Sequence, residues 1–214
     1  VGVVSRGQTW TLEGVAASVL VLGAVVFILQ SSIITPLSAS TTNQYLEERQ
    51  QDLATDVLSG AASEGELREA LRYWNEQDRV FHGAGETGYT SGAELAARDI
   101  RFGYTLRDAF GGRGITYNVY IRSPIPEESP ASMPAGAGRY GSERQSLVYQ
   151  GAPSDSAVSA STHVTLYDDD VLLDSNGDAT TARLDTADFY ADEAAVGDDT
   201  IYTVVEVQIV AWQS

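Results

Sequence analysis

The strongest constraint in this sequence is an apolar stretch near its beginning. No charged residue occurs in Val15–Leu29, and after a short polar break apolar residues continue to Ile34. At 1.5 Å per residue, a helix from Val15 to Ile34 would be roughly 30 Å long, which matches the hydrocarbon thickness of a bilayer. Arg6 precedes the stretch, and Glu47 is the first charge beyond it. The pattern therefore predicts a single-pass membrane protein with a cytoplasmic N-terminus and an extracellular C-terminal domain.

The same stretch admits other interpretations. A secretory signal would have a shorter apolar core and a small-residue cleavage site, for which Ser38-Ala39-Ser40 is suitable. A plain single-pass anchor would need no cleavage at all. Neither interpretation gives a role to Arg6-Gly7-Gln8, just before the helix, or to Glu13 near its start.

Those residues resemble the class III, prepilin-type signal of archaeal type IV pilin-like proteins. In such a signal a basic and a small residue precede the cut, so the resemblance implies that a prepilin-type signal peptidase cleaves between Gly7 and Gln8. It also implies that the retained helices of neighbouring pilin-like subunits bundle together, with Glu13 guiding their docking. A carboxylate that enters lipid is costly, so Glu13 is expected either to find a partner or to stay hydrated at the interface. Cleavage before Gln8 places Glu13 sixth in the mature chain, whereas the bacterial pilin pattern has the acidic residue fifth.

Longer pieces of the sequence extend the resemblance. They are RGQTWTLEGVAASVLVLGAVVFILQ, TPLSAST, LVYQGAPSDSAVSA and VTLYDDD, and they look like an uncharacterised family of haloarchaeal pilin-like membrane proteins. The pieces run from Arg6 to about Asp170, and the strand-like tail to Trp212 also fits. The resemblance implies a structural or adhesive cell-surface protein that contacts the lipid membrane and belongs to a type IV pilus-like filament.

The charge balance restricts the partners. The chain has 30 acidic and 13 basic residues, a net charge of −17, and every basic residue is Arg. Such a surface repels phosphate, which excludes nucleic acid as a main partner. An acidic excess without Lys is typical of proteins that stay soluble in high salt, although a GC-rich genome also depletes Lys. The absence of Cys excludes disulfides, thiol nucleophiles and Cys-ligated zinc.

Apolar spacing predicts helices in the first half of the chain. Pro36 should kink the N-terminal helix, which then continues outside the membrane to Gly60. Ser63-x-x-Glu66 and Ser91-x-x-Glu94 are capping-box patterns, and each should open a shorter helix. We therefore expect a long kinked N-terminal transmembrane helix followed by short helices.

After Gly114 the apolar period changes to two, as in half-buried strands. The expected strands are Ile115–Ile121, Ser146–Gln150, Val158–Tyr167 and a central strand at Thr200–Trp212. The Pro- and Gly-rich residues 123–142 predict a mobile loop. Helices followed by strands favour an α+β fold with an antiparallel sheet, type IV pilin-like in arrangement. The expected organisation is a leader at 1–14, a transmembrane helix at 15–34, its continuation at 35–60 and an extracytoplasmic acidic domain at 61–214.

One acidic segment has the spacing of a calcium loop. Positions one, three, five and twelve are Asp174, Asn176, Asp178 and Asp185. Ala179 stands where such a loop has glycine, and Asn176-Gly177 suits a hairpin turn equally well. We expect no metal and no other cofactor, with calcium at these four residues as the alternative. The preceding Asp168-Asp169-Asp170 is expected to be a solvated acidic turn.

Motifs that would indicate catalysis are weak. Gly83-x-Gly85-x-x-Gly88 has dinucleotide-fingerprint spacing, but no βαβ pattern surrounds it, so it is interpreted as a flexible glycine loop. His82 and His163 are far apart, and no GxSxG nucleophile elbow occurs. The chain is therefore expected not to be an enzyme. The expected function is that of a structural or adhesive pilin-like protein; the alternative is an anchored or secreted ligand-binding module that does not polymerise.

Overall fold

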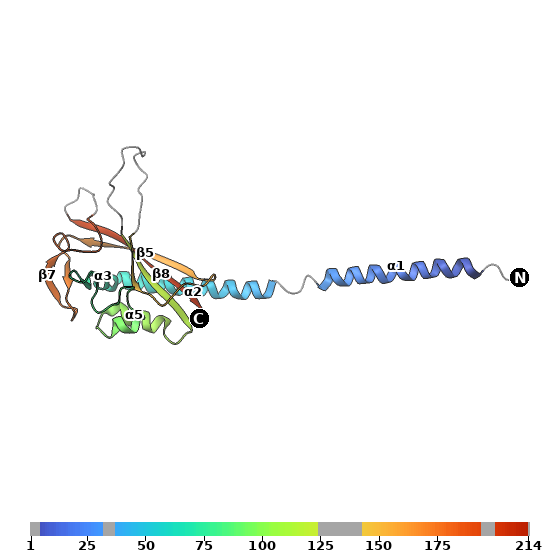
Figure 1. Ribbon diagram of the computed structural model, residues 1–214, viewed down its shortest axis with the longest axis horizontal. Coiled ribbons are helices and arrows are strands. Elements are labelled where there is room, and N and C mark those ends of the chain that lie inside the picture. Colours follow the sequence, from blue (N-terminus) through green and yellow to red (C-terminus); the bar gives the residue numbers. More distant parts are fainter. Residues whose placement is uncertain (1–4, 32–36, 124–142, 194–199, 214) are drawn as a thin grey trace, which may run out of the picture. The chain divides into compact units, whose positions relative to one another are not determined.

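The computed structural model describes residues 5–31, 37–123, 143–193 and 200–213 (Figure 1). The chain divides into two compact units, Val1–Leu46 and Glu47–Ser214. The elements in chain order are α1 (Ser5–Ser31), α2 (Leu37–Ser63), α3 (Glu66–Arg72), β1 (Trp74–Asn75), β2 (Val80–Phe81), α4 (Gly92–Ala96), α5 (Arg101–Phe110), β3 (Ile115–Ser123), β4 (Glu143–Val148), β5 (Val158–Tyr167), β6 (Val171–Leu173), β7 (Ala179–Arg183) and β8 (Ile201–Gln213).

The N-terminal region is not the long kinked transmembrane helix that the sequence predicts. It holds two separate helices, α1 and α2, and residues 32–36 between them, Pro36 included, lie outside the described residues. In the described part of the chain, no helix combines the length and apolar character needed to span a membrane. These findings overturn the predicted span at 15–34 and the single-pass localisation that rested on it.

The α+β class and the antiparallel sheet agree with the prediction. The main sheet has the strand order β4-β3-β8-β5, and each neighbouring pair is antiparallel. β8 is a long central strand, as the sequence predicts, and it pairs with β3 on one side and β5 on the other. β4 and β5 are consequently the two edges of the sheet. The predicted Pro- and Gly-rich loop falls almost entirely at 124–142, outside the described residues.

One face of the sheet and several helices enclose a single apolar core. The strand β8 turns alternate residues inward, namely Val205, Val207, Ile209 and Ala211. Helix α5 contributes Phe102, Leu106 and Phe110, which are four residues apart and therefore share one helix face. The second half of α2 contributes Ala54, Val57, Leu58 and Ala61 at the same kind of spacing. Burial of these faces is the main reason that the strands and helices associate.

Only one of the two predicted capping boxes forms a cap. Ser91 accepts a hydrogen bond from the amide of Glu94 at 3.4 Å and starts α4. At the other predicted capping box, Ser63-x-x-Glu66, α2 does not end at Gly60 but continues to Ser63. The hydroxyl of Ser63 donates to the Gly60 carbonyl at 2.8 Å. Gly65, with φ of 76°, then separates α2 from α3. Ser63 therefore ends a helix instead of starting one.

Helices α4 and α5 approach each other at a glycine. The chain reverses between them at Asp99, whose φ is 62°. A Cβ at Gly103 would collide with the backbone nitrogen of Ala96 and would lie 2.6 Å from the carbonyl carbon of Leu95. The close crossing of the two helices consequently requires glycine at this position.

Candidate functional site

Helix α1 exposes apolar side chains around its whole circumference. Val19, Leu20, Val21 and Leu22 are consecutive, and each is at least 63% exposed. Consecutive helical residues lie about 100° apart, so these four surround the helix instead of forming one stripe. All residues from 14 to 26 are exposed and none is charged. A helix that is apolar on every side is normally enclosed by several apolar neighbours.

The residues predicted to direct processing and docking belong to the same helix. Arg6, Gly7 and Gln8 fall within α1, which begins at Ser5, and their side chains lie outside the described part of the chain. Glu13 is exposed and immediately precedes the uncharged stretch. Cleavage between Gly7 and Gln8 and docking through Glu13 stay predictions.

The glycine-rich loop is not free, because it is bound to the edge strand β4. The Tyr89 amide donates to the Leu147 carbonyl at 2.9 Å, and the Tyr149 amide donates to the Tyr89 carbonyl at 2.8 Å. Gly88 has φ of 94°, and a Cβ there would lie 2.6 Å from the Ser146 carbonyl oxygen. Glycine allows both this backbone conformation and the close approach. The loop therefore covers the β4 edge at residues 147–149.

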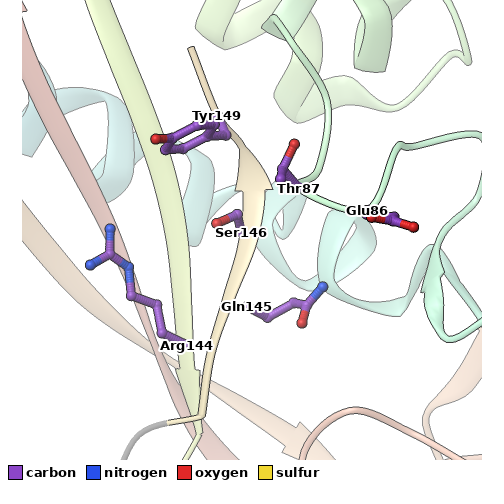
Figure 2. A pocket seen from close by; sticks show the side chains of 6 residues that line it. All are labelled: Glu86, Thr87, Arg144, Gln145, Ser146 and Tyr149. Carbon is purple, nitrogen blue, oxygen red and sulfur yellow. The ribbon is translucent and has the colours of Figure 1, made fainter. Parts of the chain in front are cut away.

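A groove of about 200 Å³ lies between this loop and β4 (Figure 2). Its lining consists of Glu86, Thr87, Arg144, Gln145, Ser146 and Tyr149. Arg144 and Tyr149 lie on one side of β4, whereas Gln145 lies on the side of Glu86 (Figure 2). Successive strand residues point to opposite faces of a sheet, so these side chains do not converge on one point. The described lining residues include no His.

The one guanidinium in the groove already has a partner within the chain. The guanidinium carbon of Arg144 lies 3.3 Å from the centroid of the Tyr120 ring, a close cation–π contact. In the neighbouring strand, Arg122 Nη1 lies 3.6 Å from Glu206 Oε2. These contacts hold the two arginines against the outer face of the sheet.

The predicted calcium loop is a hairpin turn between β6 and β7. Asp174 Oδ1 accepts hydrogen bonds from the amides of Asn176 at 2.8 Å and Asp178 at 3.0 Å. These bonds stabilise the ionised carboxylate and lower the pKa of Asp174. Asp185 lies beyond β7 and pairs with Arg183 at 3.1 Å. Within the described ranges, no three His, Asp or Glu side chains are grouped so as to hold a metal ion.

The two histidines lie on different elements and make structural contacts. His82 Nε2 lies 3.0 Å from the Leu173 carbonyl oxygen, and its ring centroid is 5.0 Å from that of Tyr73. His163 is exposed on β5, in register with Glu206 of β8. His82 lies beside the turn between β6 and β7, where its charge contributes to lowering the pKa of Asp174 after the two backbone hydrogen bonds.

The sequence predicts that the N-terminal helix carries the function, with its apolar surface facing lipid or neighbouring subunits, and that role stays a prediction. The sequence does not predict the binding of the glycine loop to β4. The glycine pattern at 83–88 is visible in the sequence, yet nothing local predicts that its partner is a strand about sixty residues later.

Comparison with known proteins gives a family but no established activity. A protein of Archaeoglobus fulgidus, described as an uncharacterized protein, is 43% identical to this chain over 60 residues. The aligned part covers 28% of this chain and 33% of that relative, so the chain spans about a third of the relative's length. No solved structure matches the chain. The family of unknown function DUF7288 matches residues 6–211, so the chain belongs to the DUF7288 family.

Proposed function

We propose that this protein is a pilin-like structural subunit that assembles with copies of itself through helix α1. The observation that carries the proposal is the apolar circumference of α1 at Val19–Leu22. Burial of apolar surface contributes about 25 cal/mol per Å², so an exposed helix of this kind gains most from apolar neighbours.

Copies of the same helix are well matched to this surface. The net charge of −17 makes most surfaces of two copies repel each other. Residues 14–26 of α1 carry no charge, so two copies of this segment meet without that repulsion. The acidic composition thus directs self-association toward α1.

The geometry favours a bundle of several helices over a two-stranded contact. A two-stranded coiled coil needs only one apolar stripe, whereas α1 is apolar on every side. Small residues allow helix backbones to approach closely. Apart from the helix's own backbone, no atom of the described residues lies within 4 Å of a Cβ placed at Gly14 or Gly23, so both positions are open to a neighbouring helix. Such a bundle is the core expected of a filament.

The proposed processing fits this assembly. Cleavage by a prepilin-type signal peptidase between Gly7 and Gln8 would leave the apolar part of α1 on the mature chain. Glu13 would then stand near the new amino terminus, where a carboxylate can pair with an amine of an adjacent subunit. The alternative, a ligand-binding module that does not polymerise, has less support because the side chains around the β4 groove do not converge.

Cysteine scanning tests the assembly. The chain has no Cys, so one introduced cysteine reports only contacts between copies. Four full-length variants, Val19→Cys, Leu20→Cys, Val21→Cys and Leu22→Cys, are oxidised at equal concentration and compared on non-reducing gels. All four should cross-link, because a bundle contacts the whole circumference. The control is Val204→Cys on β8, a 38% exposed apolar position that should stay uncross-linked.

The pattern of cross-links decides the outcome. Cross-linking at one or two of the four positions would mean a two-stranded contact and would contradict the bundle. Cross-linking no stronger than that of Val204→Cys at all four positions would overturn the proposed assembly. Light scattering on Leu20→Asp gives an independent check, since a charge in the bundle should reduce the assembly to small species.

A further inference from the structure

We propose that the edge strand β5 is a second association surface, at which two copies pair antiparallel and continue the main sheet across the interface. This inference concerns the Glu47–Ser214 unit and does not depend on helix α1. Its partner is a second copy of this chain.

The two edges of the main sheet differ in how they are covered. The β4 edge is bridged by Tyr89 at residues 147–149. β5 is ten residues long, and in the described part of the chain it pairs only with β8. Its register is continuous from Val158 to Leu166, so no bulge turns this edge away. A strand paired on one side leaves every second N–H and C=O on its other side available to an added strand.

β5 also lacks the side chains that usually prevent pairing at an edge. Charges and prolines are the common protective devices of edge strands. Residues 158–166 contain no Asp, Glu, Arg or Pro, and their one titratable side chain is His163. Residues 151–214 as a whole hold 13 acidic residues. The most acidic part of the chain therefore contains one strand whose edge does not repel a copy of itself.

The sequence of β5 is self-complementary in one antiparallel register. With the two-fold axis at Thr162, this residue faces its own counterpart. On the core side, Ala160 would face Val164 of the second copy, and Val158 would face Leu166. On the outer side, Ser161 would face His163, and Ser159 would face Thr165. Each apolar residue would therefore face an apolar residue, and each polar residue would face a polar one. Cross-strand pairs of this kind stabilise adjacent strands.

The core side of β5 retains apolar surface to bury. Val158 and Ala160 pack against the core but are only partly buried. Their proposed partners, Val164 and Leu166, are 8% and 0% exposed and belong to that core. Because Val164 and Leu166 are already covered within their own chain, the additional apolar burial on pairing would come from Val158 and Ala160. Tyr167 lies beyond the paired segment, and the guanidinium carbon of Arg68 lies 4.7 Å from the centroid of its ring.

A single cysteine at the axis tests this register. Directly opposed residues in antiparallel strands have Cα atoms about 4.5–5.5 Å apart, which is within disulfide reach. Thr162→Cys in the full chain should therefore cross-link to its counterpart. The matched control is Ser156→Cys, an exposed position six residues earlier that would lie about 40 Å from its counterpart. We expect Thr162→Cys to form the disulfide dimer at least tenfold faster than Ser156→Cys.

Two further substitutions test the same interface without a disulfide. Thr162→Asp places two carboxylates opposite each other and should abolish the dimer in light scattering at constant salt. Thr162→Val keeps the shape of the side chain and should preserve the dimer. Circular dichroism shows whether each variant is folded, and if Thr162→Asp is unfolded, the Thr162→Cys rate alone decides.

The outcomes separate this inference from the assembly through α1. Equal cross-linking of Thr162→Cys and Ser156→Cys overturns pairing at β5, even where Leu20→Cys still cross-links. Rapid cross-linking of Thr162→Cys without cross-linking of Leu20→Cys would support pairing at β5 and contradict the proposed bundle of α1 helices. A folded Thr162→Asp variant that remains a dimer in the Leu20→Asp background also overturns the β5 interface.

Discussion

Arg68 forms a bidentate ion pair with the carboxylate of Asp170: Nη2 lies 2.6 Å from Oδ1, and Nε donates to Oδ2 at 2.9 Å. Asp170 is 6% exposed and also accepts a hydrogen bond from the Tyr167 amide at 2.8 Å. The pair fastens α3 to the turn between β5 and β6. The solvated acidic turn predicted at 168–170 is therefore wrong for Asp170, whereas Asp169 is exposed as predicted.

Asp170→Asn should destabilise the protein, because it leaves Arg68 without its carboxylate. Removing one partner of a fully buried ion pair costs about 3–5 kcal/mol. Arg68 is 37% exposed, and solvent weakens the pair, so we expect a loss of about 2 kcal/mol in the free energy of unfolding. Chemical denaturation of both proteins at constant salt measures this difference in the free energy of unfolding. Asp169→Asn removes the same charge from an exposed neighbour and should cost little; equal losses would contradict the role of the pair.

Gly103→Ala should destabilise the contact between α4 and α5, since its Cβ would collide with the backbone at Ala96. We expect a loss of about 2 kcal/mol or more from overpacking. Gly60→Ala is the matched control, because no described atom outside the helix's own backbone lies within 4 Å of a Cβ at that position. It should stabilise the protein by about 0.5–1 kcal/mol through helix propensity. Thermal unfolding of both variants gives the comparison, and stabilisation by both would contradict the close crossing.

Buried tyrosines predict a loss of stability at high pH. Burial raises the pKa of Tyr202 to about 12 and also raises the pKa values of Tyr89 and Tyr190. In the unfolded chain these phenols ionise near pH 10, so the folded state retains protons that the unfolded state has lost. Stability is therefore complete below pH 10 and falls as the pH rises toward 12.

Tyr202→Phe tests that origin of the alkaline loss. The substitution removes a phenol that donates to the Ala191 carbonyl at 2.7 Å, so stability at pH 8 should fall slightly. Between pH 10 and 12 the variant should lose stability less steeply than the wild type, as denaturant titrations at several pH values will show. Parallel curves for the two proteins would rule out Tyr202 as a cause.

Gly7→Leu should block processing in a host that has a prepilin-type signal peptidase. The small residue before the cut is part of the recognition that the class III resemblance implies. Intact mass spectrometry of the wild-type protein should give a chain that starts at Gln8, and the variant should keep its leader. A normal mature mass from Gly7→Leu would refute the proposed cut.

Glu13→Gln should weaken assembly, because it removes the carboxylate proposed to pair with a neighbouring amine. The expected result is a higher critical concentration for assembly in light scattering, with the cross-links at Leu20 reduced. Glu48→Gln makes the same charge change at an exposed position of α2 and should have no effect. Identical assembly of the Glu13→Gln and Glu48→Gln variants would contradict the proposed docking role of Glu13.

The strands were the most predictable part of the fold. Alternation is a local property, and it gave β5 with the bounds that the structure has, Val158–Tyr167. Pairing order is not local. The sequence does not show that β5 becomes an edge, nor that Gly88 and Tyr89 cover the opposite edge. Those relationships depend on contacts between residues that are distant along the chain.

The helix boundaries show the same limit. Ser63 and Ser91 head the same capping motif, yet only Ser91 caps a helix. At Ser63 the preceding helix continues because Leu58 and Ala61 are buried in the core, and tertiary packing overrides the local signal. The apolar stretch at the N-terminus predicts one span to Ile34, whereas α1 ends at Ser31.

The bridge that Tyr89 makes to β4 limits what strand addition can build. Two copies joined at β5 would present β4 at both outer margins, and each margin is closed at residues 147–149 by its own loop. At these residues neither outer margin can accept a further strand, which restricts continued cross-β stacking there.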